Sequence, residues 1–166
     1  MTPDADLHTL AVRVGEALMA RSHRVVAAES CTGGFIAKTL TDIPGSSQWF
    51  DCGYVTYSNA AKIRDLGVAS RTLDEHGAVS EAVVREMAAG ALAVSGVDVA
   101  IAVTGIAGPD GAAPGKPVGT VWFGTGVRRD AEVEVAAERV LGVDEGGHPA
   151  RALHFGNDLQ SERRLA

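Results

Sequence analysis

Cysteine, basic charge and long apolar runs are all scarce in this sequence, and each shortage excludes a class of protein. The only two cysteines, Cys31 and Cys52, stand far apart in no metal-like spacing, so neither a disulfide framework nor a cysteine zinc site is expected. No apolar run approaches the roughly 18–20 uncharged residues that a membrane helix needs. Residues 1–6 are acidic and lack the basic start of a signal peptide. We therefore expect a cytoplasmic location and no membrane partner.

Acidic residues outnumber basic ones, 21 Asp and Glu against 15 Lys and Arg, and the formal net charge is −6. Nucleic-acid-binding proteins more often carry a basic face or stripe. Here the basic residues are scattered, so no nucleic-acid partner is expected. The five histidines stand singly, and no metal site is predicted. With 166 residues, of which 46% are hydrophobic, the chain is long enough to bury a core as one domain over 1–166.

Hydrophobic periodicity and turn residues divide the chain into alternating helices and strands. Helices are predicted at 6–20, 35–40, 59–66 and 81–94, and strands at 23–28, 50–57, 98–104, 118–127 and 131–137. Helices that alternate with buried strands indicate an α/β fold with both faces of the sheet covered. The last two strands, joined by 128–130, form a predicted antiparallel hairpin. The sheet is therefore expected to be mixed.

The segment Glu29–Gly34 (ESCTGG) is the sharpest local feature. A strand is predicted to end there, a hydroxyl follows at Ser30, and a glycine pair stands where a helix begins. Backbone N–H groups at a helix start lack partners and favour negative charge, from a phosphate or a forming oxyanion. Ser30 is therefore a candidate nucleophile. The alternative is that Ser30 or Thr32 only caps the helix, because both residue types are preferred N-caps.

A second segment, Tyr57–Lys62 (YSNAAK), supplies a candidate base. A lysine can take a proton from a serine if burial lowers its pKa, because desolvation disfavours the ammonium form. The alternative is that Lys62 is an ordinary solvated surface charge. The spacing of Ser30 and Lys62 along the chain does not by itself bring them together.

A third segment, Thr104–Pro109 (TGIAGP), follows a buried strand, where open α/β sheets place their ligand loops. It matches neither a dinucleotide-binding glycine motif nor a phosphate-binding P-loop. Taken alone it is equally well a glycine-rich turn. Three such loops at three strand ends are placed to converge on one crevice. Cys31 is a rival nucleophile that ranks below Ser30, because no histidine accompanies it.

Together and in this order, these segments resemble the CinA C-terminal domain family, the nicotinamide mononucleotide amidohydrolases. The similarity runs from about Leu7 to Val127. It is carried by AESCTGG (28–34), the stretch 40–62, LGV (66–68), the stretch 76–92, AVTGIAGPDG (102–111) and KPVGTVWFG (116–124). The resemblance implies a three-layer α/β/α domain with a mixed, mostly parallel sheet that assembles as a homodimer. It also implies hydrolysis of the carboxamide of nicotinamide mononucleotide, giving nicotinic acid mononucleotide and ammonia, without a metal or an organic cofactor.

The resemblance also assigns roles to individual residues. It implies that Ser30 is the nucleophile, that Lys62 is the base and that Tyr57 assists. The residues implied to contact the nucleotide substrate are Glu29, Cys31, Thr32, Gly33, Gly34, Asn59, Thr104, Gly105, Ala107 and Gly108.

The sequence departs from the family pattern after the hairpin. Family members continue with a Phe-x-Gly-Asp-Arg block and a closing helix, whereas residues 142–166 form a divergent tail in which 155–158 read Phe-Gly-Asn-Asp. Larger family members also carry a preceding domain, which is not expected here. The departure leaves two alternatives open. One is a non-catalytic module of the same fold that binds a nucleotide or a partner, and the other is a Ser–Lys hydrolase for a different amide.

Overall fold

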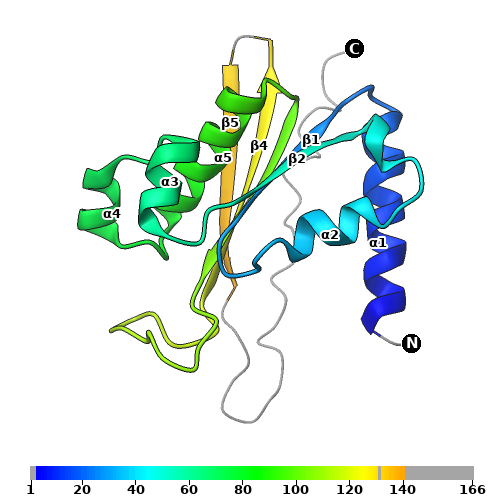
Figure 1. Ribbon diagram of the computed structural model, residues 1–166. Helices are drawn as coiled ribbons and strands as arrows, with labels where there is room; N and C mark the ends of the chain where they lie inside the picture. Colours follow the sequence, from blue (N-terminus) through cyan, green and yellow to red (C-terminus); the bar gives the residue numbers. More distant parts are fainter. Residues whose placement is uncertain (1–2, 131, 141–166) are drawn as a thin grey trace, which may run out of the picture.

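The computed structural model describes residues 3–130 and 132–140 and shows an α/β arrangement (Figure 1). The helices are α1 (Pro3–Met19), α2 (Phe35–Thr41), α3 (Asn59–Leu66), α4 (Ser70–His76) and α5 (Glu81–Ser95), with a short 3-10 helix, η1 (Ser46–Gln48). The strands are β1 (Val25–Glu29), β2 (Phe50–Val55), β3 (Val99–Gly105), β4 (Val121–Arg129) and β5 (Glu132–Val140).

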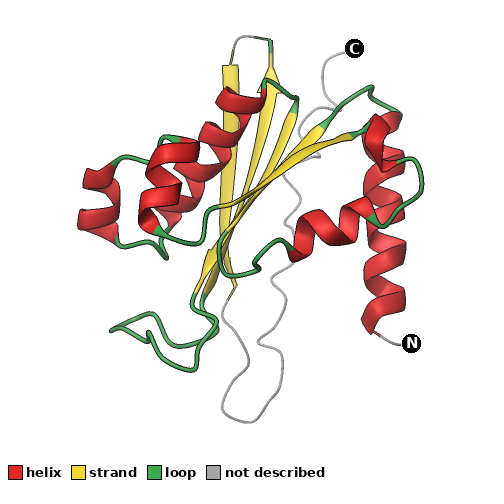
Figure 2. Cartoon of the chain, in the orientation of Figure 1, coloured by secondary structure: helices red, strands yellow, loops and turns green. Residues whose placement is uncertain are grey.

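The strands form one mixed sheet in the order β2-β1-β3-β4-β5. β1 pairs in parallel with β2 and β3, whereas the β3–β4 and β4–β5 pairings are antiparallel. Helices α1 and α2 lie on one face of the sheet, and α3, α4 and α5 lie on the other (Figure 2). The structure thus confirms the predicted α/β class and the mixed sheet with helices on both faces.

The larger core lies between the sheet and α5. Alternate residues of β1 and β3 face this helix, among them Ala28 and Ala102, which are fully buried with Val84 and Met87 of α5. The small side chains of Ala28 and Ala102 let α5 approach the sheet closely. The smaller core packs α1 and α2 around Trp49 on the opposite face. Because β1 lies between β2 and β3 and is covered by helices on both faces, all five of its residues are buried.

Helix α3 is positioned by local signals and by one close backbone contact. Ser58 caps its start by accepting a hydrogen bond from the backbone N–H of Ala61, and Gly67 ends it with a positive φ of 66°, as glycine allows. Gly90 of α5 faces the end of α3: a Cβ built there would lie 1.8 Å from the carbonyl oxygen of Leu66. Only a glycine admits this approach, which fixes the helix that carries Lys62.

Several predicted boundaries were wrong at sheet ends. β2 stops at Val55 rather than 57, and the N–H of Thr56 donates to the carbonyl of Glu29 as the chain leaves the edge. β4 begins at Val121 rather than 118, because a turn bonds the N–H of Thr120 to the carbonyl of Pro117. β4 then runs through the predicted turn at 128–130 as far as residue 129.

Helix α4 has no counterpart among the predicted elements, and its partners explain why. The carboxylate of Glu86, on α5, accepts hydrogen bonds from the backbone N–H of Ala69 and from the hydroxyl of Thr72. The start of α4 is therefore stabilised by a helix distant in sequence and carries no local cap.

Within the described ranges, no helix is both long and apolar enough to cross a membrane. The predictions for 142–166 lie outside the described residues.

Candidate active site

A pocket of about 310 Å³ opens at the end of the sheet where β1 and β3 finish. Segments from four parts of the chain meet there: the residues after β1, the start of α3, the turn before α5 and the β3–β4 loop. Its lining residues are Ser30, Cys31, Tyr57, Asn59, Lys62, Ala78, Val79, Thr104, Gly105, Ile106, Ala107, Gly108, Asp110 and Gly111. The predicted convergence of three loops on one crevice is therefore present.

The side chains of Ser30 and Lys62 are in direct contact within this pocket. The Nζ of Lys62 lies 2.9 Å from the Oγ of Ser30 and 2.7 Å from the carbonyl oxygen of Thr56. Lys62 is 1% exposed and Ser30 is 8% exposed. The alternative of a solvated surface lysine is thus wrong. The two residues are 32 positions apart in sequence, and the fold brings them together.

Burial lowers the pKa of Lys62 from the ordinary lysine value, because the ammonium form loses its water; the nearby Cys31 acts weakly in the opposite sense. Within the described ranges, no carboxylate is bonded to this lysine that would favour its charged form. A neutral amine has a lone pair that accepts a proton. In the structure Nζ donates to both the Oγ of Ser30 and the carbonyl of Thr56. A neutral amine can keep the bond to Thr56 with one N–H and turn its lone pair to the hydroxyl of Ser30, because the same 2.9 Å separation serves either direction of donation.

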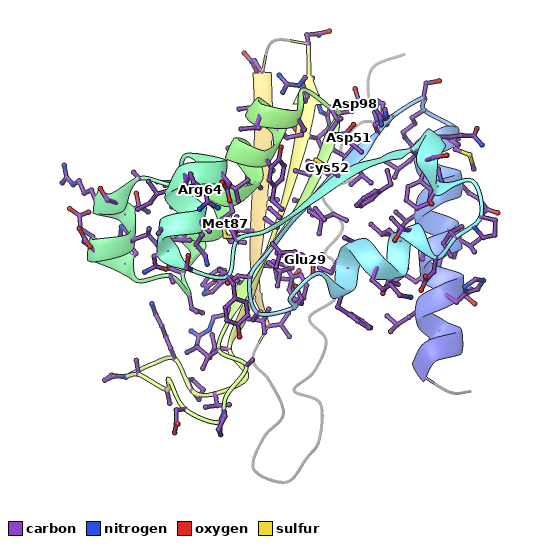
Figure 3. The ribbon with its side chains drawn as sticks, viewed as in Figure 1. Glu29, Asp51, Cys52, Arg64, Met87 and Asp98 are labelled. Carbon is purple, nitrogen blue, oxygen red and sulfur yellow. The ribbon has the colours of Figure 1, made fainter. Side chains whose placement is uncertain are left out.

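Glu29 fills the anion site that the sequence predicts at the start of α2. Its buried carboxylate accepts hydrogen bonds from the backbone N–H groups of Gly34, Ile36 and Ala37 at 3.1, 3.1 and 2.8 Å. Figure 3 shows Glu29 where the chain leaves β1 towards α2. The helix is therefore capped by Glu29, not by Ser30 or Thr32. A substrate phosphate cannot occupy the same N–H groups.

The turn after Ser30 has backbone N–H groups of its own, separate from those that Glu29 occupies at the start of α2. The N–H of Gly33 donates to the carbonyl of Ser30 at 3.1 Å. In the part of the chain that the structure describes, the N–H groups of Cys31 and Thr32 donate to no backbone carbonyl. Both lie close enough to the Cys31 sulfur to act on its pKa. These two groups are the available candidates for holding an oxyanion.

Cys31 packs against Gly105 on the floor of the pocket. A Cβ on Gly105 would lie 2.9 Å from the Cys31 sulfur and 2.9 Å from the carbonyl oxygen of Thr120, so a larger residue at 105 would push the thiol out of place. Burial raises the pKa of the Cys31 thiol above its ordinary value, although Lys62 and nearby N–H groups partly oppose this. The sulfur therefore remains protonated at neutral pH, which weakens it as a nucleophile.

The turn before α5 forms the wall opposite Ser30. The hydroxyl of Thr104 donates to the carbonyl of Ala78 at 2.9 Å, and the Nζ of Lys116 donates to the carbonyl of His76 at 2.7 Å. Two side chains from β3 and from the β3–β4 loop thus hold this wall in position. Tyr57, on the other side, is 70% exposed and stands at the mouth.

Comparison with known proteins identifies the family of this chain. The CinA C-terminal domain family matches residues 7–144. The chain belongs to this family. The Enterobacter agglomerans protein named nicotinamide-nucleotide amidohydrolase PncC is 58% identical over 136 residues, 82% of each chain. The protein of the same name from Escherichia coli K12 is 58% identical over 120 residues, 72% of this chain and 73% of the relative.

Solved structures of the CinA family share the fold. A competence damage-inducible protein A from Klebsiella pneumoniae aligns with a TM-score of 0.76 at 44% identity, covering 83% of each chain. A competence/damage inducible protein from Agrobacterium tumefaciens aligns with a TM-score of 0.74 at 46% identity, covering 80% of this chain and 79% of the other. The three-layer fold expected from the resemblance is therefore that of the family.

The pocket at the end of β1 and β3 is lined by most of the residues predicted from the sequence to form the site, but not by all of them. Those that line it are Ser30, Cys31, Tyr57, Asn59, Lys62, Thr104, Gly105, Ala107 and Gly108. Those outside the lining are Glu29, Thr32, Gly33 and Gly34. The lining residues that were not predicted as site residues are Ala78, Val79, Ile106, Asp110 and Gly111. Ala78 and Val79 precede a helix and carry no polar side chain, so only the tertiary contacts of Thr104 and Lys116 reveal them. Among the described residues, no group of three or more His, Cys, Asp or Glu is placed to hold a metal.

Proposed function

We propose that this protein hydrolyses the carboxamide of nicotinamide mononucleotide, giving nicotinic acid mononucleotide and ammonia, with Ser30 as nucleophile and Lys62 as base. The observation that carries the proposal is the 2.9 Å contact between the two buried side chains in a pocket. The substrate follows from the relatives named nicotinamide-nucleotide amidohydrolase, which are 58% identical to this chain.

The first half of the reaction forms an acyl-enzyme. Neutral Lys62 takes the hydroxyl proton of Ser30 while Oγ bonds to the carbonyl carbon of the substrate. The carbonyl oxygen becomes an oxyanion, which the N–H groups of Cys31 and Thr32 hold. One donor of this kind lowers the barrier by about 2.7–4 kcal/mol. The C–N bond then breaks, the nitrogen receives the proton from the Lys62 ammonium, and ammonia leaves.

The second half returns the enzyme to its starting state. Lys62, neutral again, takes a proton from a water molecule whose oxygen attacks the nicotinoyl carbon. The bond to Ser30 breaks, Oγ regains a proton from Lys62, and the acid product leaves. In the first half, Tyr57, which stands at the exposed mouth, assists by relaying the Lys62 proton to the departing nitrogen.

A purely binding role explains the Ser30–Lys62 pair less well. A lysine that binds an anionic ligand has to stay charged, whereas burial lowers the pKa of Lys62. Burying an amine away from an acidic partner also disfavours folding while the amine is charged. A chemical role accounts for this arrangement, because it produces an uncharged base beside a hydroxyl. The binding module and the hydrolase for another amide remain as outcomes of the assay below.

The test is release of ammonia from nicotinamide mononucleotide by wild type, Ser30→Ala and Lys62→Ala. Ser47→Ala is the matched control, because Ser47 is exposed and lies away from the pocket. We expect wild type and Ser47→Ala to turn over and the two site variants to fall by a thousandfold or more, as for other catalytic serines (about 10³ or greater). Full activity of Ser30→Ala would end the mechanism. Binding without turnover by wild type would favour the module, and preference for another pyridine amide would replace the substrate.

Assembly is a separate part of the proposal. We expect a homodimer of single-domain chains, as the family resemblance implies. Light scattering that returns only the mass of one chain, 17.1 kDa, would contradict it.

A further inference from the structure

Thr104 is the immediate cross-strand neighbour of the nucleophile. β1 and β3 run parallel with Glu29 opposite Val103, and the N–H of Ser30 donates to the carbonyl of Val103 at 3.0 Å. The next residues, Ser30 and Thr104, therefore continue the sheet face that carries Ala28 and Ala102. Both line the pocket, and Thr104 is only 1% exposed.

The hydroxyl of Thr104 donates its only hydrogen to a backbone carbonyl. A threonine hydroxyl has one hydrogen to donate and two lone pairs that accept. Its partner, the carbonyl oxygen of Ala78 at 2.9 Å, can only accept, so the hydrogen of Thr104 is committed to it. What remains of the Thr104 hydroxyl is an acceptor, next to the serine that attacks.

The groups around Ser30 thus differ in hydrogen-bonding character. The N–H groups of Cys31 and Thr32, in the turn after Ser30, are donors that bond to no backbone carbonyl among the described residues and lie within reach of the Cys31 sulfur. The oxygen of Thr104, on the neighbouring strand, is an acceptor. A carboxamide has matching ends, because its oxygen accepts and its NH₂ donates. A carboxylate has two acceptors, so one of its oxygens would face another acceptor, which is costly in a buried site.

We propose that Thr104 determines specificity for the amide over the acid: its acceptor oxygen binds the NH₂ of the substrate carboxamide and disfavours the carboxylate product. This inference rests on the proposed function, because it assumes a carboxamide at Ser30. It gives the site a means of releasing the acid once it has formed. It also orients the leaving nitrogen on the Thr104 side and the oxygen on the donor side.

The test compares amide and acid binding in the Ser30→Ala background, where the amide is not consumed. Calorimetry measures the dissociation constants of nicotinamide mononucleotide and nicotinic acid mononucleotide, with Thr104→Val and Thr104→Ser added in turn. We expect Thr104→Val to lower the preference for the amide about tenfold or more, and Thr104→Ser to keep it, since a polar group that recognises a hydrogen-bonding substrate discriminates strongly. A merely structural role would weaken both ligands alike. An unchanged ratio in Thr104→Val would overturn the inference.

A change in the ligand gives the same test without altering Thr104. The mononucleotide of 3-acetylpyridine replaces the NH₂ by a methyl group of similar size and has no N–H to donate. Ser30→Ala protein should bind it at least about tenfold more weakly than the amide. Equal binding would overturn the inference. Ammonia release by wild type tests the proposed function separately. If wild type releases no ammonia, the proposed function is wrong. If it does release ammonia but the amide and the acetylpyridine mononucleotide bind equally well to the Ser30→Ala protein, only the role of Thr104 is wrong.

Discussion

The carboxylate of Glu29 lies 2.8 Å from the backbone nitrogen of Ala37 and also accepts from two further N–H groups at the start of α2. The residue just before Ser30 therefore anchors the helix just after it. This contact fixes both ends of the turn that carries Ser30. It also means that the positive end of α2 is neutralised by the protein itself, so in the proposed mechanism the oxyanion relies on the N–H groups within the turn.

Glu29→Gln should destabilise the fold by about 1.5–3 kcal/mol, because a neutral amide replaces the charged acceptor of a buried network and its NH₂ cannot accept. Glu16→Gln is the matched control: Glu16 is exposed on α1, where such changes stay within about 0.5 kcal/mol. Urea unfolding followed by circular dichroism measures both. Equal unfolding free energies for the two variants would show that Glu29 does not anchor the turn.

The lowered pKa of Lys62 predicts the shape of the pH–rate profile. Burial favours the neutral amine, which is the base in the proposed mechanism. We expect kcat/KM to rise with pH through the Lys62 pKa and then level off, at a midpoint below the ordinary lysine value of 10.5. Lys62→Arg should be inactive across the range, since arginine stays charged. A rising limb centred on 10.5, or an active arginine variant, would contradict this role.

The same pKa shift predicts how stability depends on pH. Because the folded-state pKa of Lys62 is lowered, the unfolded chain binds more protons between that pKa and 10.5. The contribution of Lys62 to the unfolding free energy therefore increases as pH rises from its folded-state pKa to 10.5. Lys62→Met removes the titrating group while keeping an apolar side chain of similar length. The unfolding free energy of wild type minus that of Lys62→Met should increase with pH below 10.5 and then level off. A difference independent of pH would refute the shift.

Local signals in the sequence predict the elements around the site better than the site itself. Ser58 and Gly67 bound α3 as expected, because caps act within one helical turn. The contact between Ser30 and Lys62 depends instead on α3 packing against α5, which no local pattern encodes. The role of Glu29 was also hidden, since an acidic residue at a strand end usually faces water. The recognition of Ser30 and Lys62 as partners came from the family resemblance, and the geometry shows why they belong together.

Gly90→Ala tests whether the packing of α3 on α5 supports the site. In an exposed helix this change stabilises by about 1 kcal/mol. Here the new methyl would meet the carbonyl oxygen of Leu66, so we expect the opposite sign, a loss of about 1–3 kcal/mol, as for overpacked cores. Since α3 carries Lys62, kcat should fall as well. Urea unfolding and the ammonia assay check both effects. A more stable variant with wild-type turnover would show that this close approach is dispensable.

The proposed mechanism requires that the hydroxyl of Ser30, and not the thiol of Cys31, attacks the carboxamide with Lys62 as its base. Acid quenching of wild type during turnover of nicotinamide mononucleotide, followed by digestion and mass spectrometry, would identify the residue that carries the acyl group. We predict one acyl group with the mass of nicotinamide mononucleotide less ammonia on Ser30, which persists in Cys31→Ala and disappears in Ser30→Ala and Lys62→Met. The same acyl group on Cys31, or sustained ammonia release by Ser30→Ala, would contradict it.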